Sequence, residues 1–223
     1  MRRRSLVVSV ALMAILSAPV RGQTCLGLAS YSGAPVQVSG KGSLTSTSTS
    51  FLAGLGYGLP SSVFGSVAFG TTSDDNFGGS SREIGATAGY QIALGRTGAI
   101  QLCPIASFGL GLGPTNTLNS GVDRSRKTAS IGVALATSFV ASPRMKIVPS
   151  VGLSYAYQLD KAENNAGASL FQIAEHFALA QVGVGLVLDS NLSVRPGVDI
   201  PFSLNIKDPS VALTVSYSFG RKR

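Results

Sequence analysis

The sequence predicts an all-β chain that closes into an antiparallel, up-and-down β-barrel of ten strands crossing a membrane, and three observations lead to that prediction. Apolar and small or polar residues alternate with a period of two over most of the chain, which is typical of strands. The face opposite the apolar one carries mostly Gly, Ser, Ala and Thr, which suits the crowded interior of a small barrel better than the wet face of a soluble sheet. Charged residues gather in the connections, as expected where strand exteriors meet lipid.

The composition limits the other classes of protein. The chain has 223 residues, of which 44% are hydrophobic and 13% charged, so it fits one domain and is not disordered. No uninterrupted apolar run reaches about 18 residues, which argues against membrane-spanning helices. The formal charge of +8 comes mainly from the two chain ends, so a nucleic-acid partner is not expected. One His and two Cys offer little for a metal site, and no cofactor is expected either.

Residues 1–22 have the pattern of a secretory signal peptide. Three arginines at positions 2–4 precede an apolar core at 6–16, and small residues follow it, which predicts cleavage near Gly22–Gln23. An uncleaved anchor is an alternative, although the apolar stretch is short for a membrane span. A lipoprotein acylated at Cys25 is another, although the residues before that cysteine are not the small ones expected. Export places the mature chain in an oxidising compartment.

Each predicted strand rests on its own run of alternating residues. Phe51, Leu55 and Tyr57 alternate with glycines, and the last segment alternates from Val211 to Phe219 with small or hydroxylated residues opposite. The ten predicted strands span 34–42, 49–58, 62–71, 83–94, 99–112, 128–140, 145–157, 171–188, 192–204 and 210–219. Glycines at 109–113 and 183–185 belong to this pattern, because they lack the strand–loop–helix context of a phosphate loop.

The connections alternate between short and long, as a meander requires. Turn-forming residues occupy the short ones, and polar residues fill the longer ones. The short connections are 59–61, 95–98, 141–144 and 189–191, and the longer ones are 43–48, 72–82, 114–127, 158–168 and 205–209. An even number of strands puts both termini on the side of the short turns. Closure leaves no unpaired strand edge in the bilayer.

Two of the strands are less certain from the pattern. The strand at 34–42 is short and polar, and without it and its partner the barrel would have eight strands. Between 168 and 181 the large apolar residues Phe171 and Phe177 have one parity, whereas Val182 and later residues have the other. A β-bulge would explain the change of parity, and a short helix on the loop side is the competing interpretation.

The chain from 34 to 219 resembles the small outer-membrane β-barrel proteins of diderm bacteria, the broad OmpA/OmpX/OmpW-like group. The resemblance rests on the signal peptide, the repeated alternation and the ending Leu213-Thr-Val-Ser-Tyr-Ser-Phe219, although a basic tail at 220–223 follows the terminal aromatic. It implies a location in the outer membrane, contact with its lipids, and assembly by the barrel assembly machinery, which would read Tyr217 and Phe219. The resemblance implies no particular activity.

Cys25 and Cys103 are predicted to form a disulfide. Cys103 follows the short turn at 95–98 and has the parity of the barrel interior, whereas Cys25 precedes the first strand by about ten residues. The bond would fold residues 23–33 across the periplasmic mouth of the barrel. Two free thiols are the alternative.

Polar residues on the interior parity predict what fills the barrel. Glu83, Lys146, Arg195 and Asp199 are expected to form a polar network, because a barrel of eight to ten strands is narrow enough to be filled by side chains. The same residues could instead line a pore. No catalytic residues are expected, since His176, the only histidine, has no recognisable partners for hydrolysis around it.

These observations favour a structural or surface-interaction role, exerted through the loops 72–82, 114–127 and 158–168 on a partner that the sequence does not identify. The alternatives are a narrow pore or conduit for small or hydrophobic molecules, an outer-membrane hydrolase, and a soluble lipocalin-like barrel that binds a ligand inside.

Overall fold

The computed structural model of the chain describes residues 25, 36–59, 62–74, 79–94, 100–113, 122–164, 167–189, 191–203 and 208–219. The predicted signal peptide at 1–22, all of the segment 23–33 except Cys25, and the basic tail at 220–223 lie outside the described residues.

All regular structure in the described residues is β-strand. Twelve strand segments form a single antiparallel sheet, and their bounds are as follows. They are β1 (Val36–Leu44), β2 (Ser48–Gly58), β3 (Val63–Asp74), β4 (Gly79–Tyr90), β5 (Ile92–Leu94), β6 (Ile100–Leu112), β7 (Val122–Thr137), β8 (Phe139–Ser142), β9 (Met145–Asn164), β10 (Ser169–Leu188), β11 (Leu192–Phe202) and β12 (Ser210–Phe219).

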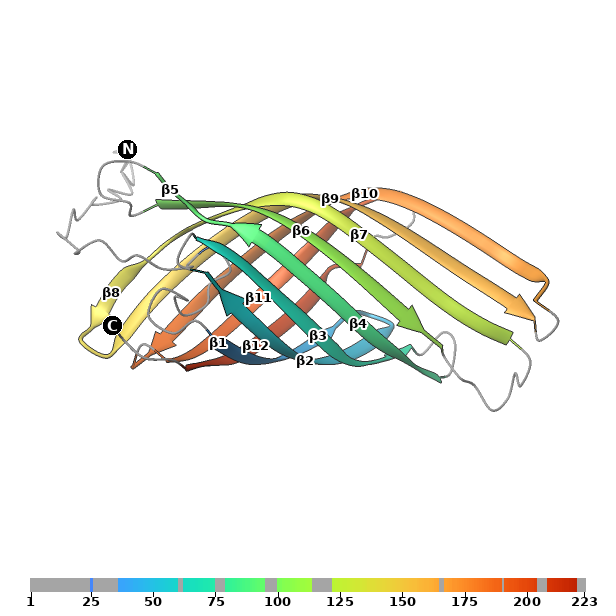
Figure 1. The fold of residues 1–223 in the computed structure, drawn as a ribbon, viewed down its shortest axis with the longest axis horizontal. Coiled ribbons are helices and arrows are strands. Elements are labelled where there is room, and N and C mark those ends of the chain that lie inside the picture. The colour runs from blue at the N-terminus through green and yellow to red at the C-terminus, as the bar shows by residue number, and fades with distance from the viewer. Residues whose placement is uncertain are drawn as a thin grey trace, which may run out of the picture.

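The sheet closes into the predicted ten-stranded barrel (Figure 1). β5 extends β4 beyond a break at Gln91, and β8 extends β7 beyond a break at Ser138. The twelve segments therefore make up ten strands of the barrel, which we call its walls. β1 pairs with β12, and β10 pairs with both β9 and β11, which completes the ring. The first strand is therefore present, with nine residues paired on both sides, and the eight-stranded alternative is excluded.

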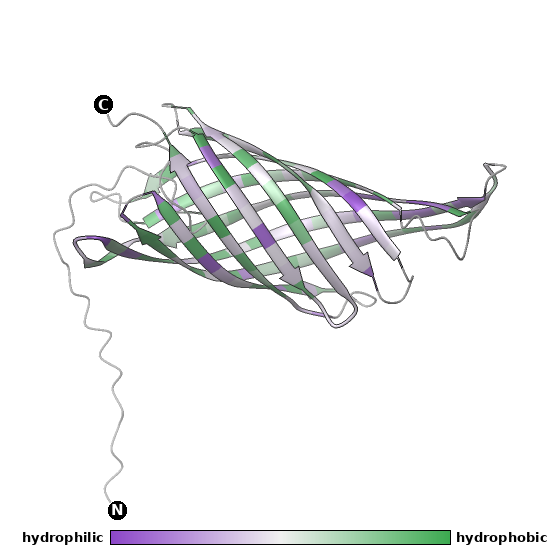
Figure 2. Ribbon diagram, turned by 90° about the horizontal axis from the view of Figure 1, so that it is seen from below, coloured by the Kyte–Doolittle hydropathy of each residue, from purple (hydrophilic) through white to green (hydrophobic). Residues whose placement is uncertain are grey.

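Side chains point alternately outward and inward along each wall, as the sequence predicted. The outward positions carry large apolar residues that remain exposed, among them Phe51 and Phe69 at 61% and Ile131 at 68%. Figure 2 shows these hydrophobic positions spread along the strands around the barrel. An apolar surface of this extent suits contact with lipid. No helix long and apolar enough to cross a membrane occurs in the part of the chain that the structure describes.

Several walls are longer than the sequence predicted, among them β3 and β4, which pair over most of the predicted loop 72–82. β9 and β10 have 20 residues each and β7 has 16, and their ends project past the other strands (Figure 1). Much of the predicted connections 114–127 and 158–168 is thus paired strand: Asp123 faces Glu163, and Arg126 faces Asp160. The charges that marked these segments as loops instead lie on a ribbon beyond the apolar belt. The opposite charges of Arg126 and Asp160 stabilise its pairing, whereas Asp123 and Glu163 are like charges.

The change of parity near residues 168–181 has a different cause from the two that were predicted. β10 pairs with β9 without interruption from Phe171 to Leu188, and the register shifts only between Ser169 and Phe171. The helix interpretation was therefore wrong. A bulge or irregularity is present at Ser169–Phe171, within the predicted segment, but it precedes the change of parity and does not account for it. The strand is regular, and its outer part carries the large apolar side chains on the interior face, where Phe171 and Ile173 line a cavity.

Candidate functional site: the barrel interior

The interior has three levels, which we describe from the end with the short turns (the turn end) to the end with the longer connections (the loop end). In transmembrane barrels short turns face the periplasm and longer loops face the outside.

A compact apolar cluster fills the interior at the turn end. The predicted disulfide between Cys25 and Cys103 is present, with both residues at most 1% exposed. Cys103 on β6 packs with Phe64 of β3 and Ala134 of β7, and all of these side chains are buried. The ring of Phe64 takes the space over its cross-strand neighbour Gly89, where a Cβ would overlap the ring. The disulfide thus holds Cys25 inside the barrel.

Buried hydrogen bonds fill the seam where the first and last strands meet. The side-chain amide of Gln37 on β1 donates to Ser216 Oγ at 3.2 Å and to Ser218 Oγ at 3.3 Å on β12. All three residues are at most 3% exposed. Because a buried amide without partners is costly, this pairing also holds the barrel closed.

The middle level contains two of the four residues predicted as a polar network. Arg195 and Asp199 both point inward from β11. Arg195 donates to Ser150 Oγ at 3.3 Å, and Gln181 donates to Asp199 at 3.1 Å. Lys41 Nζ lies 3.9 Å from Asp199 Oδ2. The sequence analysis missed Lys41, Gln181 and Ser150, although each has the parity of the interior.

The other two residues of the predicted network lie at different levels. Glu83 is near the loop end, where it lines the cavity described below. Lys146 is the second residue of β9 and so lies at the turn end. Gly183 makes room for the arginine of the middle level, because a Cβ there would lie 2.8 Å from Arg195 Nε. Parity places a residue inside the barrel, but it does not say at which height.

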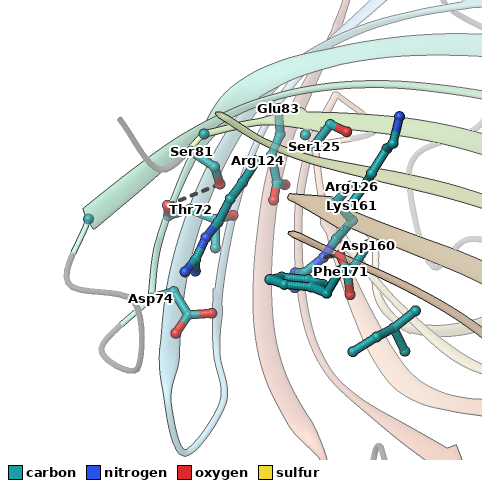
Figure 3. Close-up of a pocket in the computed structure, with 14 residues that line it drawn as sticks. Thr72, Asp74, Ser81, Glu83, Arg124, Ser125, Arg126, Asp160, Lys161 and Phe171 are labelled. Carbon is teal, nitrogen blue, oxygen red and sulfur yellow. Dashed lines mark hydrogen bonds and ion pairs between the residues drawn. The ribbon is translucent and has the colours of Figure 1, made fainter. Parts of the chain in front are cut away.

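The loop end holds a cavity of about 340 Å³, which we call the mouth cavity (Figure 3). It lies within the ring formed by β3, β4, β6, β7, β9 and β10, and it faces the side of the longer connections. Its lining residues are Thr72, Asp74, Gly79, Ser81, Glu83, Gly111, Gly113, Arg124, Ser125, Arg126, Asp160, Lys161, Phe171 and Ile173. A second void of about 190 Å³ shares Glu83, Gly111 and Arg126 with it and extends it toward the middle level.

Most charged groups of the mouth cavity have partners. Arg126 Nε lies 2.7 Å from Asp160 Oδ1, and Gln158 donates to Asp160 Oδ2 at 2.7 Å. Lys161 forms an ion pair with Glu163. The guanidinium of Arg124 lies 6.0 Å from the centre of the Phe171 ring, within reach of a cation–π interaction.

Three polar groups of the lining stand apart. Arg124 Nη1 is buried without a hydrogen-bond partner, although Arg124 has another interaction. Thr72 is 8% exposed, and its hydroxyl has no hydrogen-bond partner. Glu83 makes neither a hydrogen bond nor an ion pair in the part of the chain that the structure describes. Sequence reasoning missed Thr72, Arg124 and Phe171 because it assigned the first two to the edges of loops and the third to an irregular strand. The interior parity of Phe171 was the available clue.

The remaining predicted residues lie on the outer surface of the barrel. Tyr217 and Phe219 point outward at the turn end, with ring centres 5.2 Å apart. His176 points outward from β10, between Tyr155 at 5.8 Å and Tyr157 at 4.9 Å. Within the described ranges no group of three or more His, Cys, Asp or Glu residues could hold a metal ion.

Comparison with known proteins identifies the fold. No family model matches the sequence, and no curated protein matches it. Among solved structures, the β domain of the Bordetella autotransporter BrkA is similar at a TM-score of 0.51 and 10% identity, over 84% of this chain and 99% of that one. Neisserial surface protein A has a TM-score of 0.41 at 14% identity, over 84% and 97%. The N-terminal barrel of Pseudomonas aeruginosa OprF has 0.34 at 13%, over 82% and 96%. The chain therefore has the fold of the outer-membrane β-barrels.

Proposed function

We propose that this chain resides in the outer membrane of a diderm bacterium and acts at the cell surface through the loop end of the barrel, without conducting solutes and without catalysis. The observation that carries the proposal is the asymmetry of the interior. Buried side chains pack around Cys25 and Cys103 at the turn end, whereas the loop end holds a cavity. A barrel with a packed cluster at one end and a cavity at the other suits binding or adhesion better than passage.

The exterior supports contact with lipids and with the assembly machinery. The apolar belt would bury itself in the hydrocarbon region, and Tyr155 and Tyr157 would suit an interface, where aromatic residues are common. Tyr217 and Phe219 end the last strand and remain accessible, as a segment read by the barrel assembly machinery would be. We propose that the partner of the surface role is contacted by the connections after β3, β6 and β9.

The location predicts a specific behaviour on a gel. The membrane fraction of cells expressing the chain should show one band unheated and another, of changed mobility, after boiling, because a closed barrel stays folded in cold detergent. A chain recovered from the soluble fraction without that shift would instead favour the soluble ligand-binding barrel.

Conductance tests the absence of a pore. The purified protein in a planar lipid bilayer should give no sustained current above that of lipid alone, because the cluster at the turn end blocks the lumen. A variant that lacks residues 23–33 and carries Cys103→Ala should conduct more than the parent. Its matched control is Cys103→Ala with the segment retained. Sustained current from the parent protein would replace the proposal with the pore function.

A further inference from the structure

We propose that the mouth cavity binds a small organic cation with an apolar body, such as a quaternary ammonium attached to a ring or a short alkyl group. This inference deepens the proposed function and rests on it, because the cavity must face the outside to meet such a ligand. It follows from the charge, the unpaired polar groups and the apolar wall of the cavity.

One carboxylate that lines the mouth cavity has no ion-pair partner among the described residues. Arg126 is matched by Asp160, and Lys161 by Glu163. Arg124 and Asp74, which carry opposite charges, both have further partners, although Arg124 Nη1 is buried without a hydrogen bond. Glu83 remains as the lining carboxylate without an ion pair among the described residues. An entering cation would therefore find a partner in Glu83.

A second, independent group points into the same space. The hydroxyl of Thr72 is buried and unpartnered, although buried polar groups are normally hydrogen-bonded. Thr72 and Glu83 come from neighbouring strands, β3 and β4, and both line the cavity (Figure 3). A ligand or the water that accompanies it could satisfy this hydroxyl.

One wall of the cavity is apolar. Phe171 and Ile173 line the cavity from β10, whereas Thr72 and Glu83 line it from β3 and β4. They offer a surface against which a ring or alkyl group can pack while its cationic end approaches Glu83. The volume of about 340 Å³ is at the small end of the range for ligand sites, so the ligand should be small.

The test uses benzyltrimethylammonium as the probe and the folded barrel in a nonionic detergent, with titration calorimetry and empty micelles as the blank. Parent protein should bind with a dissociation constant on the order of millimolar, as expected for so small a ligand. Glu83→Gln keeps the shape and removes the charge, and should weaken binding at least about tenfold. Benzenesulfonate, an anion of similar shape, should bind at least about tenfold more weakly than the cation.

Asp189→Asn is the matched control. It removes the same charge at the turn end, outside the cavity, and asparagine tolerates the left-handed conformation that Asp189 adopts, with φ of 48°. It should leave the affinity for benzyltrimethylammonium within about twofold of the parent value, well inside the tenfold change expected at the site. The heat-dependent gel shift verifies that each variant is folded.

Thr72→Val gives a second variant if Glu83→Gln does not fold. It replaces the unpartnered hydroxyl by a methyl group, so the barrel should be at least as stable as the parent, while binding should weaken several-fold. Absence of binding to the parent, equal affinity for benzenesulfonate, or affinity unchanged by both variants would overturn the inference. None of these results would affect the conductance test, so the two proposals fail separately.

Discussion

Replacing Gly70 by alanine should prevent the barrel from folding. A Cβ on Gly70 would overlap the carbonyl oxygen of Phe51 and would lie 2.8 Å from the Cα of Leu52. Both obstacles are backbone atoms of β2, which pairs with β3 along its whole length, so they cannot move without breaking the ladder. We expect the free energy of unfolding to fall by at least about 3 kcal/mol, which is the upper end of the usual range for overpacking, because no side chain can rearrange to relieve the contact.

Gly42→Ala is the matched control for this prediction. Gly42 lies on β1 with no atom within 4 Å of the position that a Cβ would take. The same substitution there should change the free energy of unfolding by less than about 1 kcal/mol, in the favourable direction, because alanine restricts the unfolded chain. The chain has no Trp, so the folded fraction is best read from the gel shift and from far-UV circular dichroism during urea titration. A folded Gly70→Ala barrel with the stability of the Gly42→Ala protein would contradict the close approach of β2 and β3.

Removing the disulfide should lower the free energy of unfolding by about 4 kcal/mol. Cys25 and Cys103 are 78 residues apart in the sequence. In the chain-entropy model, a disulfide that closes a loop of this length stabilises the folded state because it lowers the conformational entropy of the unfolded chain. The double variant Cys25→Ala/Cys103→Ala is preferable to serine, because serine would bury two hydroxyls in an apolar cluster. The midpoint of urea unfolding should fall.

Reduction supplies the control within the same experiment. Dithiothreitol should move the midpoint of the parent protein toward that of the double variant, and it should leave the double variant unchanged. A difference between oxidised parent and double variant below about 1 kcal/mol would mean that the N-terminal segment contributes little to the barrel, contrary to the loop-closure argument.

The alternation of residue types was sufficient to predict most of the fold. In Val211–Phe219 every second side chain is large and apolar, and the structure turns these outward while Ser216 and Ser218 are buried. Since the pleat sends successive side chains to opposite faces, parity alone assigned Cys103 to the interior, and with it the disulfide. The number of walls and their antiparallel order followed from counting the alternating segments and the turns between them.

The ends of the strands could not be predicted in the same way. Residues 123–127 and 158–163 read as connections because they are charged, yet they pair across the ladder between β7 and β9. Polarity marks where lipid ends, whereas the strand ends where backbone pairing ends, and these two limits differ whenever a ribbon projects into water. Phe171 and Ile173 changed parity for the same reason, because lipid no longer dictates which face carries the apolar residues.

The sequence by itself therefore determined which side chains face inward, how many walls close the barrel, and which cysteines pair. Only the tertiary structure decided which interior residues share a level: it brought Asp199 to Lys41 and Gln181 and Arg195 to Ser150, and it placed Glu83 apart from them in the mouth cavity. The physical reason is that alternation is a local property of each strand. The height at which residues of different strands meet depends instead on register and tilt around the closed ring, which no single strand encodes.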